Sequence, residues 1–179
     1  MSKKLLSLIV AITLIFVAVP MVQAASKPTL KVSSCEAKQG ETITLSVSIE
    51  NNPGINTFSF GFDYDVSKLK LLDVTVNDNL GGQFTYKSKA VWFNSKDTKY
   101  NGEILELKFK VLNSEKIGKT DVRVTYSPGD ISNAKEKDVN FNIVAGTVVI
   151  SEQKITVSFF TKVMDFFQKI LSLLKNLFN

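Results

Sequence analysis

Histidine is absent from this sequence of 179 residues, and cysteine occurs only once, as Cys35. The lack of histidine excludes catalytic triads and acid–base pairs that use an imidazole, and zinc sites built from histidine and cysteine. A single cysteine forms neither an internal disulfide nor a paired-cysteine metal site. We therefore expect Cys35 to be a small buried hydrophobic residue, with an intermolecular link as the alternative.

The positive charge is modest and lies mostly at the two ends of the chain. The formal net charge is +5, of which Lys3 and Lys4 contribute 2, while three lysines against one aspartate in residues 157–179 contribute a further 2. The body is left with about +1. Nucleic-acid binding needs a concentrated basic face, so this class of function is excluded.

The first 24 residues have the pattern of a secretory signal peptide. Lys3 and Lys4 precede an apolar run over residues 5–19, Pro20 ends the run, and Val22-Gln23-Ala24 before Ala25 fits the small-residue cleavage pattern. An uncleaved membrane anchor needs roughly 20 apolar residues and is the minority alternative. We predict a secreted, extracellular protein that begins at Ala25.

Between residues 26 and 150 the hydrophobic pattern has the period of β-strands. In 55–64, for example, Phe58, Phe60, Phe62 and Tyr64 share one face and small polar residues share the other. The phase of 69–77 slips after Leu71, which predicts a bulge. The other expected strands are 29–34, 41–50, 83–87, 90–94, 103–111, 121–126 and 139–150. About nine strands with one apolar face each predict an all-β fold, a sandwich or jelly roll of two packed antiparallel sheets.

The order of these strands and turns resembles the cohesin domain of bacterial cellulosome scaffolds over about residues 28–150. The resemblance rests on short motifs in a fixed order: Gly40-Glu41-Thr42, Gly54-Ile55-Asn56, Phe62-Asp63-Tyr64-Asp65 followed by Leu69, Asn101-Gly102-Glu103-Ile104-Leu105 leading into 107–111, and Ala145-Gly146-Thr147-Val148-Val149-Ile150. It implies a nine-stranded jelly-roll sandwich. It also implies a non-catalytic function, which is binding the dockerin module of another secreted protein, usually a glycoside hydrolase.

The resemblance also implies a binding face on one sheet, which includes Thr57 and Ser59. The best-known cohesins carry Asn and Asp at these two positions, so the hydroxyls here point to a different dockerin class. Tyr86 and the strand 90–95 are expected on the same face, with either Val91 and Phe93 or Trp92 and Asn94 pointing outward. No cofactor or metal is expected on this chain, because the calcium belongs to the dockerin.

Two further classes of function depend on other side chains. Tyr86, Trp92 and Tyr100 would form the sugar-stacking platform of a carbohydrate-binding module, which is the second candidate function. Asp63 and Asp65 share one strand face, as calcium ligands or the acids of a glycosidase would. We favour the simpler interpretation, in which Asp65 starts a turn and Asp63 is solvated, so no enzymatic activity is predicted. A generic adhesion or structural sandwich is a further alternative.

From Val157 the hydrophobic period changes to that of an amphipathic helix with a broad apolar face. Charges near its centre disfavour a membrane span, and a narrow polar stripe with lysines favours an interfacial helix. Self-association and packing on the sandwich are the alternatives. The residues expected to make this contact are Phe159, Phe160, Phe166, Phe167, Ile170 and Leu174. The predicted organisation is a signal peptide (1–24), a cohesin-like sandwich (25–151), and a linker and helix (152–179) that would hold the protein at the cell surface.

Overall fold

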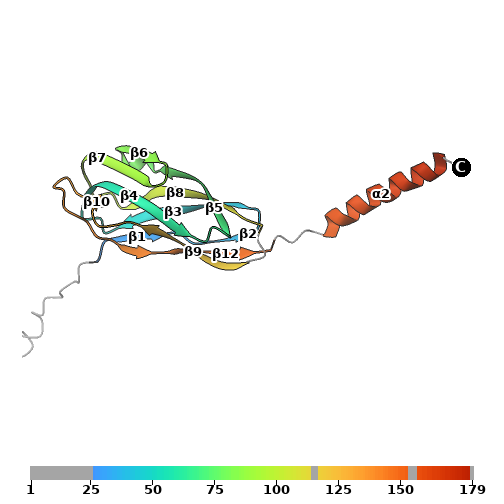
Figure 1. The fold of residues 1–179 in the computed structure, drawn as a ribbon, viewed down its shortest axis with the longest axis horizontal. Coiled ribbons are helices and arrows are strands. Elements are labelled where there is room, and N and C mark those ends of the chain that lie inside the picture. The colour runs from blue at the N-terminus through green and yellow to red at the C-terminus, as the bar shows by residue number, and fades with distance from the viewer. Residues whose placement is uncertain (1–25, 114–116, 153–156, 178–179) are drawn as a thin grey trace, which may run out of the picture.

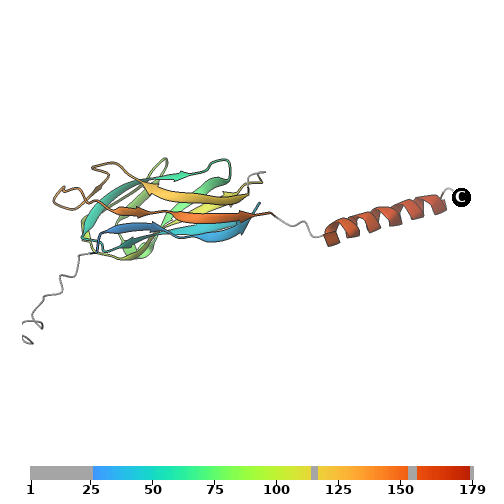
Figure 2. The ribbon, with the colours of Figure 1, turned by 90° about the horizontal axis from the view of Figure 1, so that it is seen from below.

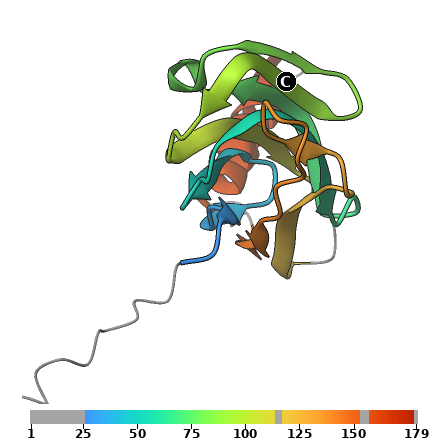
Figure 3. The same ribbon diagram turned by 90° about the vertical axis from the view of Figure 1, so that its left-hand side faces the viewer.

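The chain folds into a two-sheet β-sandwich followed by a single long helix (Figure 1). The structure is a computed structural model and describes residues 26–113, 117–152 and 157–177. The predicted signal peptide therefore lies outside the described residues. Seen end-on, the strands curl around a common interior (Figure 3).

The first sheet has five strands, and its central strands are the longest. In spatial order its strands are β11 (Asn142–Val144), β1 (Thr29–Val32), β3 (Thr42–Glu50), β8 (Gly102–Val111) and β5 (Leu69–Val76). The extra residue predicted in 69–77 is confirmed, because the β5–β8 register shifts between Leu71 and Asp73. Leu72 is left on the outside of the sheet as a result.

The second sheet carries the aromatic strand that the sequence pattern indicates. Its strands, in spatial order, are β2 (Cys35–Lys38), β12 (Gly146–Ser151), β9 (Gly118–Thr125), β4 (Ile55–Tyr64), β7 (Ala90–Thr98) and β6 (Gln83–Tyr86), with the short β10 (Ile131–Ser132) paired to β4. A single 3₁₀ turn, η1 (Asp78–Leu80), precedes β6 in the described residues. The helix α2 spans Val157–Leu177.

The described residues form twelve strands rather than about nine, for two reasons. The predicted strand 139–150 divides into two strands, β11 and β12, that belong to different sheets, and neither β2 nor β10 was predicted. The expectation of purely antiparallel sheets is also wrong, because β1 pairs with β11 and β2 pairs with β12 in parallel. The first and last segments therefore cross between the sheets side by side (Figure 2). Gly146 lies at this crossing, where the Cβ of any other residue would collide with the Ser33 carbonyl oxygen.

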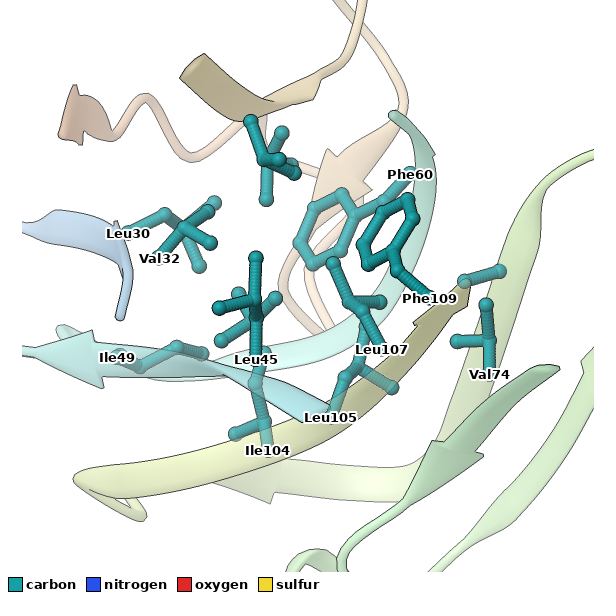
Figure 4. Close-up of a cluster of buried hydrophobic side chains, with 14 of the residues drawn as sticks. Leu30, Val32, Leu45, Ile49, Phe60, Val74, Ile104, Leu105, Leu107 and Phe109 are labelled. Carbon is teal, nitrogen blue, oxygen red and sulfur yellow. The ribbon is translucent and has the colours of Figure 1, made fainter. Parts of the chain in front are cut away.

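The core lies between the two sheets and contains the inward residues that the alternation predicts (Figure 4). Leu45 and Leu107 from the first sheet are fully buried, as are Phe58 and Phe60 from the second. Ile104, which the pattern assigned to the outer face, is also fully buried. The β3–β8 register explains this difference, because it skips Ile104 between Leu105 and Glu103 and turns the extra residue inward.

Candidate functional site

The outward side chains of β4, β7 and β6 form one continuous surface. Thr57 pairs with Phe93, and Ser59 pairs with Val91, across the β4–β7 ladder. On the other side of β7, Phe93 pairs with Gln83 and Val91 pairs with Thr85. Because directly paired residues project to the same side of a sheet, these side chains make two parallel rows. We call this surface the outer β4/β7/β6 face: Thr57, Ser59, Gln83, Thr85, Val91 and Phe93.

Phe93 is the most prominent apolar side chain of the outer β4/β7/β6 face. It is 52% exposed, although it lies in the middle strand of the three, and Val91 beside it is half-buried. Polar side chains lie on both sides of Phe93, from Gln83 on β6 and Thr57 on β4. An exposed aromatic side chain within a polar rim is the usual composition of a protein-binding hot spot.

The two hydroxyl residues on β4 differ in how they are held. The Thr57 hydroxyl donates a hydrogen bond to the Trp92 carbonyl oxygen at 3.0 Å, which fixes its side chain against β7. The Ser59 backbone N–H donates to the Asp130 carbonyl oxygen at 2.8 Å. Within the described residues, the Ser59 hydroxyl has no protein hydrogen-bond partner. Ser59 is therefore the more available of the two for a partner.

Three predicted binding residues do not point to this surface. Trp92 is 0% exposed and stacks on Phe58 with ring centroids 5.3 Å apart. Its indole N–H donates to the Gly81 carbonyl oxygen at 2.6 Å, so its polar atom is satisfied inside the fold. Tyr86 pairs with the buried Ala90 and packs against the core, and burial is the main cause that raises its pKa. Asn94 is half-buried beyond the last β7 residue paired with β6, and its side chain accepts a hydrogen bond from the Ser95 N–H.

These placements decide the phase that the sequence left open. The alternative with Val91 and Phe93 outward is confirmed, and the alternative with Trp92 and Asn94 outward is wrong. The prediction that Tyr86 lies on the same side of the sheet as Thr57 and Ser59 is also wrong. Because Trp92 is enclosed, it does not form the sugar-stacking platform expected with Tyr86 and Tyr100. Gln83 and Thr85 belong to the face but were missed, since their position depends on which strand pairs with β7.

A loop beside Ser59 forms one edge of the face and is held by Asp130. Its carboxylate accepts hydrogen bonds from the Ser127 backbone N–H at 2.8 Å and from the Lys89 ammonium at 3.0 Å. The backbone hydrogen bond from Ser127 is the main cause that lowers the pKa of Asp130 below its usual value of 3.8. The ionised carboxylate therefore stabilises this edge.

Asp130→Ala is expected to lower the free energy of unfolding by about 1 kcal/mol at neutral pH. Because the pKa of Asp130 is lowered in the folded state, its contribution is complete above the usual 3.8 and is lost as the pH falls through the folded-state value. Urea denaturation should therefore show wild type and variant converging in acid. Asp63→Ala is the matched control, since Asp63 is exposed and lies 3.7 Å from Arg123, so its loss should cost less than about 0.5 kcal/mol. Equal effects of the two substitutions would contradict this role of Asp130.

The surroundings of Asp63 and Asp65 are those of a solvated residue and a turn residue, not of acids in a catalytic site or of metal ligands. Asp65 accepts hydrogen bonds from the Ser67 N–H at 2.9 Å and the Ser67 hydroxyl at 2.6 Å, so it starts a turn as expected. In the described part of the chain, no three His, Cys, Asp or Glu side chains come together as a candidate metal site. Cys35 is half-buried beside the core, and burial raises the pKa of its thiol.

The helix α2 lies beyond the end of β12, apart from the sandwich (Figure 1). Four of the six predicted contact residues are exposed: Phe166, Phe167, Ile170 and Leu174. The side chains of Phe159 and Phe160 lie outside the part that the structure describes. Among the helix side chains that the structure describes, the large apolar ones from Met164 to Leu174 are exposed rather than packed on the sandwich. Among the described residues, no helix has the length and apolar character that a bilayer crossing requires.

The fold and the face together define a β-sandwich module whose candidate site is an open sheet surface. The cohesin domain family model matches residues 28–150. The chain therefore belongs to the cohesin domain family. Cohesin domains are non-catalytic protein–protein interaction modules, so the chain is not an enzyme. The resemblance read from the sequence is confirmed.

Solved cohesin structures share the fold at low sequence identity. A non-cellulosomal cohesin from the archaeon Archaeoglobus fulgidus is 22% identical with a TM-score of 0.61, over 72% of this chain and 94% of its own. A type I cohesin–dockerin complex from Clostridium thermocellum matches at 14% identity and a TM-score of 0.60, over 70% of this chain and 100% of the other. The sixth cohesin of scaffoldin B from Acetivibrio cellulolyticus, in complex with a dockerin, is 19% identical with a TM-score of 0.58, over 70% of this chain and 100% of the other. No curated protein sequence matches the chain.

Proposed function

We propose that this protein is a secreted docking module that binds a dockerin-bearing protein through the outer β4/β7/β6 face. The observation that carries the proposal is the common orientation of Thr57, Ser59, Val91 and Phe93 across paired strands. Membership of the cohesin family and the dockerin complexes among the structural neighbours support the identity of the partner.

The face suits a partner that covers it without entering a cleft. Phe93 supplies an apolar anchor, the half-buried Val91 extends it, and both rows of the face end in polar side chains. Such a surface gains affinity when a partner surface excludes water from the aromatic ring. A secreted polysaccharide-degrading enzyme is the expected owner of the dockerin, as the family resemblance implies.

The helix α2 supplies the second part of the proposed function, which is attachment to the cell surface. Its apolar residues from Met164 to Leu174 are exposed in the described structure, so they are available for another surface. We propose that α2 lies on a membrane while the sandwich holds the dockerin. The two roles use separate segments, so each can be removed without the other.

The docking proposal is tested by capture of dockerins encoded in the same genome. The chain from Ala25 onward, which retains every residue that the structure describes, is immobilised and exposed to the panel with calcium and then with a chelator. We expect at least one dockerin to be retained with calcium and released by chelation, because dockerins fold around calcium. Circular dichroism of the chain alone is the control, and it should not change on chelation.

Two results would contradict the docking proposal. One is retention of no dockerin in the panel by a chain that is folded. The other is retention that chelation leaves unchanged, since the bound species would then not be a calcium-folded dockerin. A parallel polysaccharide pull-down distinguishes the docking function from the second candidate function, a carbohydrate-binding module, which requires binding to the polysaccharide itself.

A further inference from the structure

The side chains of residues 161–175 divide cleanly into two faces of α2. At 3.6 residues per turn, the apolar side chains occupy about half of the helix circumference. The polar face, in order around the helix, consists of Lys175, Gln168, Thr161, Ser172, Asp165, Lys169 and Lys162. The apolar face consists of Val163, Met164, Phe166, Phe167, Ile170, Leu171, Leu173 and Leu174.

The charges on the polar face are not randomly distributed. Lys175 lies at one border with the apolar face, Lys162 and Lys169 lie at the other, and Asp165 lies between these borders. A lysine at such a border can lay its aliphatic stem along an apolar surface and extend its ammonium group to the polar side. A helix lying in the plane of a lipid interface needs this arrangement, with its apolar face among acyl chains and its cations at the headgroups.

The same arrangement disfavours a second copy of the helix as the occupant. In a pair of helices, the residues at the borders of the apolar face come opposite the border residues of the partner. Here the charged border residues are all lysines, so like charges would face each other in a symmetric pair. The apolar face is also wider than the narrow seam of a two-stranded coiled coil.

We propose that α2 lies in the plane of a membrane whose surface is anionic, and that its border lysines select the negatively charged headgroups. This inference rests on the proposed attachment of α2 to a membrane and names the lipid class. Three lysines against Asp165 give residues 161–175 a net charge of +2. At the strength usual for basic residues near an anionic surface, this charge favours anionic over neutral vesicles by roughly 30-fold.

The test compares binding to two kinds of vesicle. The chain from Ala25 onward is sedimented with vesicles of phosphatidylcholine alone and with vesicles that also contain phosphatidylglycerol. Wild type should bind the anionic vesicles roughly 30-fold more tightly.

The triple variant Lys162→Gln, Lys169→Gln, Lys175→Gln should lose this preference. Lys96→Gln, Lys99→Gln, Lys135→Gln makes the same change of charge at exposed positions on the sandwich and should keep it. Phe167→Ser with Leu171→Ser should abolish binding to both kinds of vesicle.

The outcomes separate this inference from the proposals on which it rests. Equal binding to both vesicles would overturn the lipid class but leave membrane attachment standing. Binding to neither would overturn both. If sedimentation velocity then showed an oligomer that Phe167→Ser with Leu171→Ser dissociates, a second copy would be the occupant. Capture of a dockerin is measured separately on the same variants and should be unchanged, so the docking proposal is not affected by these outcomes.

Discussion

Phe93→Ala is expected to weaken dockerin binding by about 30- to 1,000-fold, which is the range for loss of a central aromatic anchor. Phe93 is 52% exposed in the middle strand of the outer β4/β7/β6 face, with a polar neighbour paired on either side. In the complex its ring would be covered by the partner, and truncation would remove most of this contact. Titration calorimetry with the captured dockerin measures the change.

Leu72→Ala is the matched control for this substitution. Leu72 is 47% exposed at the bulge of β5, which belongs to the other sheet. Its truncation removes a similar fraction of exposed apolar side chain, but it should change the affinity by less than about twofold. An equal loss in both variants, or no loss in Phe93→Ala, would contradict the assignment of the binding face.

Trp92→Ala is expected to lower the free energy of unfolding by about 3–5 kcal/mol, as is usual for loss of a buried aromatic side chain. Trp92 is fully buried and stacks on Phe58, which in turn stacks on Phe60 at 4.2 Å. Its indole N–H also holds the loop before β6 through the Gly81 carbonyl oxygen. Truncation therefore leaves a cavity and an unpaired carbonyl group together.

Trp92→Phe separates these two effects if the alanine variant does not fold. It retains an aromatic ring for stacking on Phe58 but removes the donor to Gly81, so it should lose about 1–3 kcal/mol. Phe93→Ala, at the next position of the same strand, should change stability by less than about 1 kcal/mol because its side chain is already half in solvent. Urea denaturation of the three variants measures this contrast. Comparable losses at both positions would contradict the inward placement of Trp92.

The strands and their inward faces could be predicted because hydrophobic and polar residues alternate along them. In β4, Phe58 and Phe60 alternate with Thr57, Ser59 and Gly61, and the structure buries the two aromatic side chains. An alternation this regular leaves only one face suited to the core. It places Thr57 and Ser59 outward without knowledge of the neighbouring strands.

The phase of β7 could not be predicted because residues 90–93 are all apolar. Either alternate set of Ala90, Val91, Trp92 and Phe93 would suit a core, so the alternation rule gives no answer. The choice is made by pairing with β4, which places Trp92 opposite Phe58 and Phe93 opposite Thr57. Pairing between strands distant in sequence is not visible in the sequence pattern.

The passage of the chain from one sheet to the other is visible in the positions of the buried residues. Leu30 and Val32 are buried at even positions, whereas Ala37 is buried at an odd position after Ser33 and Ser34. A second change of parity occurs between Phe141 and Val148. Each change marks the point where the chain leaves one sheet and enters the other, so a shift of phase indicates a crossing as well as a bulge.

The central claim, that the outer β4/β7/β6 face is the docking surface, is tested most directly by mapping the bound partner on the chain. Backbone amide resonances of the chain from Ala25 onward are followed by NMR as the captured dockerin is added. We predict the largest shifts at Thr57, Ser59, Val91 and Phe93, with little change on the outer face of β3 and β8, where Thr44 pairs with Lys108. Shifts concentrated around Thr44 and Lys108 instead, with Phe93 unperturbed, would contradict the claim.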